Sequence, residues 1–494
     1  MIPLFVAIPL GGAFLISLLG KRLRGFGDWM ASLITFSVLV LTLFSIGAVR
    51  ASGVLVYHVG GWPPPRGICL VEDGLTSFML LTVNLIAFLA VIYSISYMER
   101  YTEKWKFYTL FLLMVGGMNG VVITGDMFNL FVFLEIAAIA SYALVAFGTE
   151  QEELEASFKY MVLGGLASAF ILLGIALLYG FTSTLNMADM SRALSEKQPA
   201  KIINFISVLF IMGFGLKAAL VPFHAWLPDA HPSAPAPISA MLSGVLIKVL
   251  GVYALIRILF NVLGVTPSVL NVLMVMGTIS MIAGALLAIG QSDIKRMLAY
   301  SSISQVGYIV FAFGVGTPLA ILGGLFHLIN HAVFKSLLFL NAGAVEYSIG
   351  TRDMKKMGGL NQRLPVTGYT SLIGSLSIAG VPPFNGFWSK LIIIIAAVQA
   401  GHFVYALIAV LVSVITLAYY LKLQRYTFFG ALRKEWELVK EVPLAMRLSM
   451  IILAVFCLLG GLLLLPGPSS VFLEPARDAL VEGKSYINVV LGSG

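Results

Sequence analysis

The stretch VLFIMGFGLKAALVPFHAWLPDA (208–230) decides the fold, because it places a lysine and a Val-Pro step inside an apolar run. Lys217 stands in a segment long and apolar enough to cross a bilayer, which takes about 20 residues. A charge at the bilayer centre costs roughly 3 kcal/mol, and proline breaks a helix by removing a donor. The stretch therefore predicts a broken membrane helix whose ionisable group faces a protein interior or a watered path.

Apolar runs of this kind recur from end to end. Of the 494 residues, 59% are hydrophobic and 11% are charged, whereas soluble domains average about 25% charged residues. We therefore expect an all-α polytopic membrane protein with about 14 transmembrane helices. The expected spans are 2–20, 30–49, 76–97, 108–124, 127–148, 158–180, 202–223, 237–259, 269–290, 297–315, 319–346, 366–398, 403–424 and 447–466.

Lysine and arginine are unevenly distributed over the loops. Nineteen fall on one side of the expected spans and eight on the other, and four lie within spans. Because the cytoplasmic side retains positive loops, we expect the 21–29 loop in the cytoplasm and both termini outside. The net charge of +8 thus reflects basic loop residues beside the lipid bilayer, and we expect no nucleic-acid partner.

Glu135 is an isolated carboxylate within the run FNLFVFLEIAAIASYALVAF (128–147). Desolvation disfavours a charged carboxylate, and a lysine from another span would keep it ionised. We expect Lys217 to be that partner and the pair to move protons. The alternative is a static ion pair that fixes helix packing, although apolar packing would do this at lower cost.

Two further lysines lie deep in apolar runs, Lys248 in ISAMLSGVLIKVLGVYAL (238–255) and Lys390 in FWSKLIIIIAAV (387–398). A buried lysine can exchange between its charged and neutral forms, so it can store a proton. Lys248 could instead extend to the membrane interface, but it stands about eleven residues into its span. We expect Lys390 to lie beside a break that gives it access to water.

The run FHLINHAVFKSLLF (326–339) places His327, His331 and Lys335 four residues apart, on one helix face. Two histidines at this spacing can bind a metal, but zinc needs further ligands and a neighbouring lysine repels a cation. Histidine passes protons readily near neutral pH. We therefore expect a relay between Lys248 and Lys390 and no metal site, with helix packing as the alternative role for His327.

The stretch AALVPFHAWLPDA (218–230) is echoed by IAGVPPFNGFWSK (378–390). Interrupted apolar segments at corresponding places in two halves indicate inverted repeats around a midplane ion site, although Val-Pro-Phe can recur by chance. The Pro-rich stretch 221–237 is expected to face outside. Its residues His224, Asp229 and His231 either line an exit or structure the loop, and Asp126 is expected to cap a helix N-terminus.

Nothing in the sequence indicates a resident cofactor. Cys69 and Cys457 stand far apart and match no metal or cluster spacing, and no phosphate-binding glycine motif occurs. We expect no cofactor, so any redox chemistry would belong to partner subunits. Whether the whole assembly is an enzyme stays open at this point.

Five longer motifs stand out: GDMFNLFVFLEIAAIASYAL (125–144), FGLKAALVPFHAWLPDAHPSAPAPISAMLSGVLIKVLGVYAL (214–255), DIKRMLAYSSISQVGY (293–308), HAVFKSLLFLNAG (331–343) and GVPPFNGFWSK (380–390). Together they resemble the antiporter-like subunits of respiratory complex I (its L, M and N subunits), and similar subunits occur in Mrp-type sodium/proton antiporters and energy-converting membrane-bound hydrogenases. The sequence DMFNLFVF is most similar to the D subunit of Mrp antiporters or its counterpart in archaeal hydrogenase-type complexes.

The resemblance implies two inverted five-helix repeats with broken helices 7 and 12. It implies spans 1–3 in 1–107, spans 4–8 in 108–259, spans 9–13 in 269–425, and a loop, span 14 and a tail in 426–494. It assigns Glu135 and Lys217 to one half-channel, Lys248 to the centre and Lys390 to the second half-channel, with His327 and His331 between them.

The function implied is that of a proton-translocating membrane subunit in a respiratory or hydrogenase-type complex of a prokaryotic inner membrane. Its expected partners are further antiporter-like and small membrane subunits. The alternative is the D subunit of a Mrp-type sodium/proton exchanger without redox chemistry, in which sodium also crosses. A membrane scaffold alone would not explain four buried charges.

Overall fold

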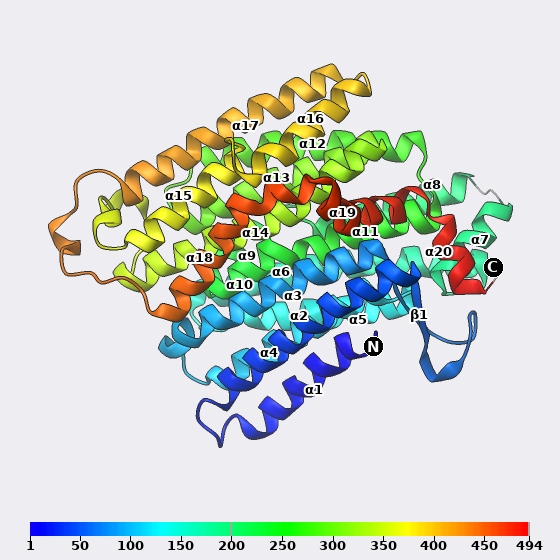
Figure 1. The fold of residues 1–494 in the computed structure, drawn as a ribbon, viewed down its shortest axis with the longest axis horizontal. Coiled ribbons are helices and arrows are strands. Elements are labelled where there is room, and N and C mark those ends of the chain that lie inside the picture. The colour runs from blue at the N-terminus through cyan, green and yellow to red at the C-terminus, as the bar shows by residue number, and fades with distance from the viewer. Residues whose placement is uncertain (198–199, 493–494) are drawn as a thin grey trace.

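The computed structural model describes residues 1–197 and 200–492, and long helices lying side by side make up nearly all of it (Figure 1). The helices α1 (Leu4–Leu19) and α17 (Phe403–Leu423) lie at opposite edges of this layer. Between them run α3 (Gly74–Tyr97) and α14 (Pro318–Ile349), which contact each other. The predicted all-α fold is confirmed. The last two residues of the expected segment 426–494 lie outside the described residues.

The N-terminal part adds a β-hairpin to its three helices. The hairpin projects from one end of the helix layer (Figure 1), and Leu55 pairs with Glu72 in its antiparallel register. Besides α1 and α3, the elements are α2 (Phe26–Ser52), β1 (Leu55–His58), η1 (Val59–Gly61), β2 (Cys69–Glu72) and η2 (Met98–Arg100).

The next part contains the first predicted break. Its helices are α4 (Lys104–Ile123), α5 (Met127–Val145), α6 (Gln151–Thr182), α7 (Met187–Lys197), α8 (Ala200–Lys217) and α9 (Leu227–Ser233). The carboxylate of Asp126 accepts a hydrogen bond from the Asn129 N–H at 2.8 Å and so caps α5. Helix α8 ends at Lys217, and the chain turns around Val221-Pro222 before α9 begins, which confirms the expected break.

A buried helical segment, Ala236–Leu263, runs through the centre. It comprises α10 (Ala236–Met241), η3 (Leu242–Leu246), η4 (Lys248–Tyr253), α11 (Ala254–Ile256) and η5 (Arg257–Leu263). The three η pieces are π-helical, with wider turns than an α-helix, and such turns often occur at functional sites. Lys248 lies at the start of the second π-helical piece.

The second half contains the other break, between α15 and α16. Its elements are α12 (Pro267–Ile289), α13 (Ile294–Val315), α14, η6 (Met354–Lys356), η7 (Leu360–Gln362), α15 (Pro365–Ala379), α16 (Asn385–Gln399), α17 and η8 (Gln424–Phe428). The C-terminal elements are η9 (Lys434–Trp436), α18 (Leu444–Leu459), η10 (Gly460–Leu464), α19 (Pro466–Val481) and α20 (Lys484–Leu491).

Within the described residues, 11 helices are long and apolar enough to cross a membrane. They correspond to expected spans 2–6, 8–11, 13 and 14. Expected span 1 is α1, a 16-residue helix, and expected spans 7 and 12 are the two interrupted segments. The count of fourteen therefore remains a prediction, because helix length alone does not decide whether these three segments cross.

In each of the helix pairs α5–α6 and α13–α14, an isolated β-bridge joins the residue before the first helix to a residue after the second. Asp126 forms an antiparallel bridge with Asn186, and Asp293 forms one with Asp353. Each pair of bridged residues is 60 positions apart, and each first residue caps the helix that follows it. These matched features support the predicted repeat, although the inverted symmetry itself stays a prediction.

Contacts between loops indicate which loops share a face. Lys104 Nζ lies 2.7 Å from Asp28 Oδ1, and Lys422 Nζ donates to the Gln291 carbonyl at 2.8 Å. Arg352 Nη2 lies 3.5 Å from Glu152 Oε2. Each of these basic residues belongs to the nineteen predicted for one side, so the contacts agree with that grouping. Which face meets the cytoplasm stays a prediction.

The expected position of the stretch 221–237 is wrong. Asp229 Oδ2 lies 3.1 Å from Lys159 Nζ, and its Oδ1 lies 3.4 Å from Arg296 Nη1, on the face with the many basic residues. The physical reason is the direction of α8, which starts near Lys201 and has already crossed the layer when the break begins. His224, Asp229 and His231 therefore belong to the face predicted to be cytoplasmic.

The opposite end of the layer is fastened by a buried ion pair. The Arg257 guanidinium donates to both carboxylate oxygens of Asp73 at 2.7 Å, and both side chains are at most 5% exposed. Asp73 also caps α3 by accepting from the Thr76 N–H. A buried two-pronged pair of this kind fixes the distance between α3 and the central segment.

Asp73→Asn should destabilise the protein, because it keeps the cap but leaves the Arg257 charge buried without its counter-charge. Breaking one partner of a buried ion pair costs about 3–5 kcal/mol. The matched control is Glu103→Gln, which removes the ion pair of Glu103 with Lys106, whose side chains are 47% and 54% exposed. Its loss should lower the free energy of unfolding by about 1 kcal/mol or less. Thermal unfolding in detergent measures both, and equal midpoints would contradict the assignment.

Candidate functional site

Glu135 on α5 meets Lys217 at the C-terminal end of α8. Lys217 Nζ lies 3.5 Å from Glu135 Oε1 and donates to the Tyr142 hydroxyl at 3.4 Å. Ser168 on α6 donates a hydrogen bond to Glu135. The expected proximity of the two charges is confirmed. The Glu135 side chain is 27% exposed and that of Lys217 3% exposed, so the pair joins the helix surface to the interior.

Lys248 lies fully buried in the central segment, which rules out the alternative that it reaches a membrane interface. Its ammonium group donates to the carbonyls of Ser243 and Gly244 at 2.5 and 2.7 Å. These acceptors belong to the preceding π-helical piece. The Ser243 hydroxyl in turn lies 2.7 Å from that of Ser302 on α13, which ties the central segment to the second half.

The two histidines of α14 are buried one turn apart. Their rings are nearly parallel, with centroids 6.3 Å apart. His327 Nδ1 lies 2.9 Å from Ser389 Oγ, and its Nε2 lies 3.2 Å from Gln305 Oε1. Neither ring nitrogen of His331 has a hydrogen-bond partner within the described part of the chain. Two side chains therefore hold the His327 ring, whereas both ring nitrogens of His331 are open within the described residues.

Lys335 lies on the same face of α14 as the two histidines, as expected. Its Nζ donates to the Leu298 carbonyl at 2.8 Å and to the Tyr420 hydroxyl at 3.1 Å. The Tyr420 and Tyr419 hydroxyls both contact Ser301 Oγ, at 3.0 and 2.8 Å. Lys335 is thus joined through hydroxyl groups to α13 and α17.

Lys390 lies beside the second break, as expected. Its Nζ donates to the Ile378 carbonyl at 2.8 Å, in the last turn of α15, and stands 4.9 Å from the centre of the Tyr308 ring. The whole residue is 2% exposed. The break leaves this carbonyl without a helical donor, so the lysine satisfies it.

The structure brings Lys248, His327, His331, Lys335 and Lys390 into one buried cluster. The charges of Lys248, Lys335 and Lys390 all act on His331. Glu135 and Lys217 form a separate cluster in the first half. A file of this kind can hold and hand on protons, because amine, imidazole and hydroxyl groups exchange them along hydrogen bonds.

Sequence reasoning missed the hydroxyl and amide groups that connect these side chains. Gln305, Tyr308, Ser301 and Ser302 all lie in the motif DIKRMLAYSSISQVGY (293–308), and Ser389 directly precedes Lys390. Polar residues within apolar spans were the signal that could have drawn attention to them, and Ser168 in the span 158–180 gave the same signal. Only the fold shows which groups they contact, as it does for Ser168 beside Glu135.

Comparison with known protein families gives two matches. A family model described as "NADH:quinone oxidoreductase/Mrp antiporter, TM" matches residues 124–416. A second, described as "NADH-Ubiquinone oxidoreductase (complex I), chain 5 N-terminus", matches residues 67–108.

Individual relatives are named either as antiporter subunits or as NADH-quinone oxidoreductase subunits. The chain is 36% identical to the Na(+)/H(+) antiporter D subunit of Alkalihalophilus pseudofirmus over 80% of each protein. It is 37% identical to the NADH-quinone oxidoreductase N subunit of Desulforudis audaxviator, over 85% of this chain and 84% of that protein.

Two solved complexes contain a chain of the same fold. A chain of the Mrp complex from Dietzia sp. DQ12-45-1b superposes with a TM-score of 0.92 at 29% identity. A chain of the membrane-bound sulfane sulfur reductase, an archaeal respiratory membrane complex, gives 0.92 at 34% identity. In both cases 99% of each chain is covered.

Proposed function

Because this chain belongs to the NADH:quinone oxidoreductase/Mrp antiporter family, we propose that it is a proton-translocating antiporter-like membrane subunit of a multisubunit complex. The observation that carries this proposal is the set of buried lysine and histidine side chains in the interior, with the half-buried Glu135 paired to Lys217. Ionisable groups this deep are expensive in a membrane and mark ion pathways. A packing role alone would be served by apolar side chains.

Each group has a proposed role in proton transfer. Glu135 and Lys217 form the first half-channel, where the lysine holds or releases a proton as its distance from the carboxylate changes. Lys248 receives the proton at the centre. His331 passes it on, with His327 and Lys335 beside it, and Lys390 delivers it in the second half-channel. The carbonyls of Ser243 and Ile378 hold the charged lysines until transfer occurs.

Two inverted repeats, 108–259 and 269–425, are proposed to frame these half-channels. The matched bridges Asp126–Asn186 and Asp293–Asp353 support this division. So does the position of one interruption in each half, after Lys217 and before Lys390. Half-channels that open to opposite faces would follow directly from inverted repeats.

The proposed partners are other membrane subunits, including further antiporter-like and small ones. The solved assemblies that contain chains of this fold are multisubunit. In a redox-driven complex the electron-transfer chemistry would belong to those partners. The proposed location is a prokaryotic inner membrane with both chain termini outside.

A second candidate function is that of the D subunit in a Mrp-type sodium/proton exchanger. It is favoured by the relative named as a Na(+)/H(+) antiporter component and by the Mrp complex structure. The first candidate is favoured by the relative named as an NADH-quinone oxidoreductase component and by the sulfane sulfur reductase complex. Neighbouring genes for redox subunits, or for small antiporter subunits only, would distinguish the two.

Lys217→Ala should lower proton transport by the assembled complex on the order of 100-fold, the scale of a lost acid–base group. Lys217→Arg should be equally inactive, because a guanidinium stays protonated and cannot release its proton. A pH-sensitive dye in inverted vesicles measures both rates. Full transport by Lys217→Arg would contradict a proton-cycling lysine.

His331→Ala should slow turnover roughly 10- to 100-fold while the complex still assembles, because it interrupts the step between Lys248 and Lys390. The matched control is His402→Ala at the start of α17, outside the buried file, which should transport at the unmodified rate. Turnover per assembled complex is the measurement. Normal turnover in His331→Ala would remove this residue from the path.

A further inference from the structure

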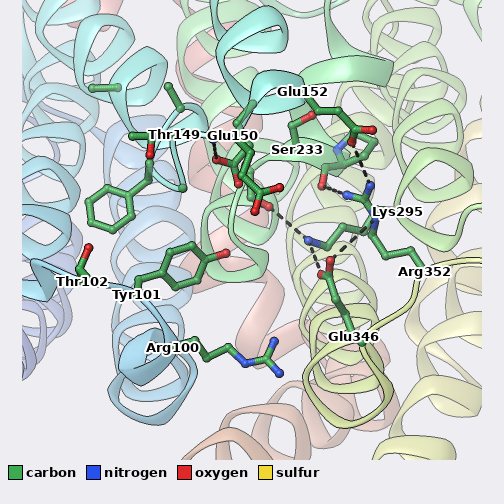
Figure 2. A pocket seen from close by; sticks show the side chains of 18 of the residues that line it. Arg100, Tyr101, Thr102, Thr149, Glu150, Glu152, Ser233, Lys295, Glu346 and Arg352 are labelled. Carbon is green, nitrogen blue, oxygen red and sulfur yellow. Dashed lines mark hydrogen bonds and ion pairs between the residues drawn. The ribbon is translucent and has the colours of Figure 1, made fainter.

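A polar pocket of about 980 Å³ opens on the face that carries Lys159, Arg296 and Arg352, and the proposed proton path does not use it. Figure 2 shows its walls, which come from the segments 100–103, 146–153, 232–234 and 350–353. These segments belong to both halves of the chain. The pocket therefore lies where the two halves meet at this face.

The pocket is acidic on a face that is otherwise basic. Seven carboxylate side chains and four lysine or arginine side chains line it, an excess of three negative charges. By contrast, this face carries most of the basic loop residues of the chain. A concave site lined by one sign of charge concentrates ions of the opposite sign, so this pocket attracts cations, including protons.

An ion-pair cluster forms one side of the pocket. Lys295 Nζ lies 2.7 Å from Glu346 Oε2, and the Lys295 side chain is 2% exposed. Arg352 Nε lies 3.8 Å from Glu346 Oε1, and Figure 2 shows the three side chains converging. Lys295 also donates to the Ala234 carbonyl at 3.2 Å, and Arg352 to the Pro232 carbonyl at 2.6 Å. The cluster therefore binds the C-terminal end of α9 through two hydrogen bonds.

His231 immediately precedes the pocket-lining residue Pro232. It is fully buried, and neither ring nitrogen has a hydrogen-bond partner in the described residues. Its ring lies 6.0 Å from that of Trp226 and 5.7 Å from that of Phe339, and the Phe339 ring lies 6.0 Å from Lys335 Nζ. A buried imidazole with two open nitrogens therefore lies in the chain next to the pocket lining and shares a ring contact with a central lysine.

We propose that this pocket is the access vestibule through which protons from its face reach the central lysines, with His231 as the carrier behind its wall. The inference rests on the proposed function. The imidazole takes a proton from a hydronium ion in the vestibule at one ring nitrogen. It releases the proton on its other nitrogen to a neutral lysine amine, so one N–H bond forms as another breaks. Lys295, Glu346 and Arg352 position α9 for this step.

The first test is chemical labelling of Ser233→Cys in the intact complex, because Ser233 lines the pocket. The native Cys69 and Cys457 are buried and give a low background. A cationic thiosulfonate should react faster than an anionic one, by a factor at least about tenfold above that at Ser183→Cys. Ser183 is exposed and follows α6, at the opposite end of that helix from the pocket residues Glu152 and Glu153. Equal ratios at the two positions would overturn the vestibule.

The second test is proton transport in vesicles. His231→Gln, and Ser233→Cys carrying the cationic label, should each lower turnover at least about tenfold, whereas labelled Ser183→Cys should keep the unmodified rate. If Lys217→Ala is inactive while both pocket variants transport normally, the vestibule is wrong and the proton path stands. If Lys217→Ala itself transports normally, the proposed function fails. The labelling ratio needs no transport, so it decides the vestibule even for an inactive variant.

Discussion

Every buried lysine in this protein needs an acceptor for its ammonium group, and this requirement explains most of the interior. In a regular helix each carbonyl already accepts from the following turn, and Lys335 shares such a carbonyl, that of Leu298 in α13. Lys248 and Lys390 instead use carbonyls where the helix is widened or interrupted, at Ser243, Gly244 and Ile378. For these two lysines, helix irregularity and buried charge compensate for each other.

The helix pairs α5–α6 and α13–α14 meet this requirement with different chemistry. The bridged residues 126 and 293, and likewise 186 and 353, are 167 positions apart, so the same offset relates Glu135 to Ser302 and Ser168 to Lys335. In the first pair the carboxylate lies on the first helix and the hydroxyl on the second. In the second pair the hydroxyl lies on the first helix and the ammonium on the second. Equivalent positions thus carry the carboxylate that pairs with Lys217 in one case and a carbonyl-bound lysine in the other.

The same frame brings side chains from distant parts of the sequence to one face. Asp229 contacts Lys159 and Arg296, and Lys295 and Arg352 hold the end of α9. The contacts of Arg296, Lys295 and Arg352 cross between the halves, because α8 brings the break after Lys217 to the face where α13 begins. The central segment then runs back across the layer, so Lys248 lies near both halves.

The sequence by itself determined the membrane class, eleven of the spans, the two breaks, the half-buried position of Glu135 and the buried positions of Lys217, Lys248, His327, His331, Lys335 and Lys390. Hydropathy, proline and the high energy of a buried charge are local properties, so they can be read from residue order. The sequence misplaced the stretch 221–237, and it could not identify Ser168, Gln305 or Ser389 as partners. Those assignments depend on which helices become neighbours. Only the tertiary structure decides this, because a buried polar atom is satisfied by whatever group the packing of distant segments brings within hydrogen-bond reach.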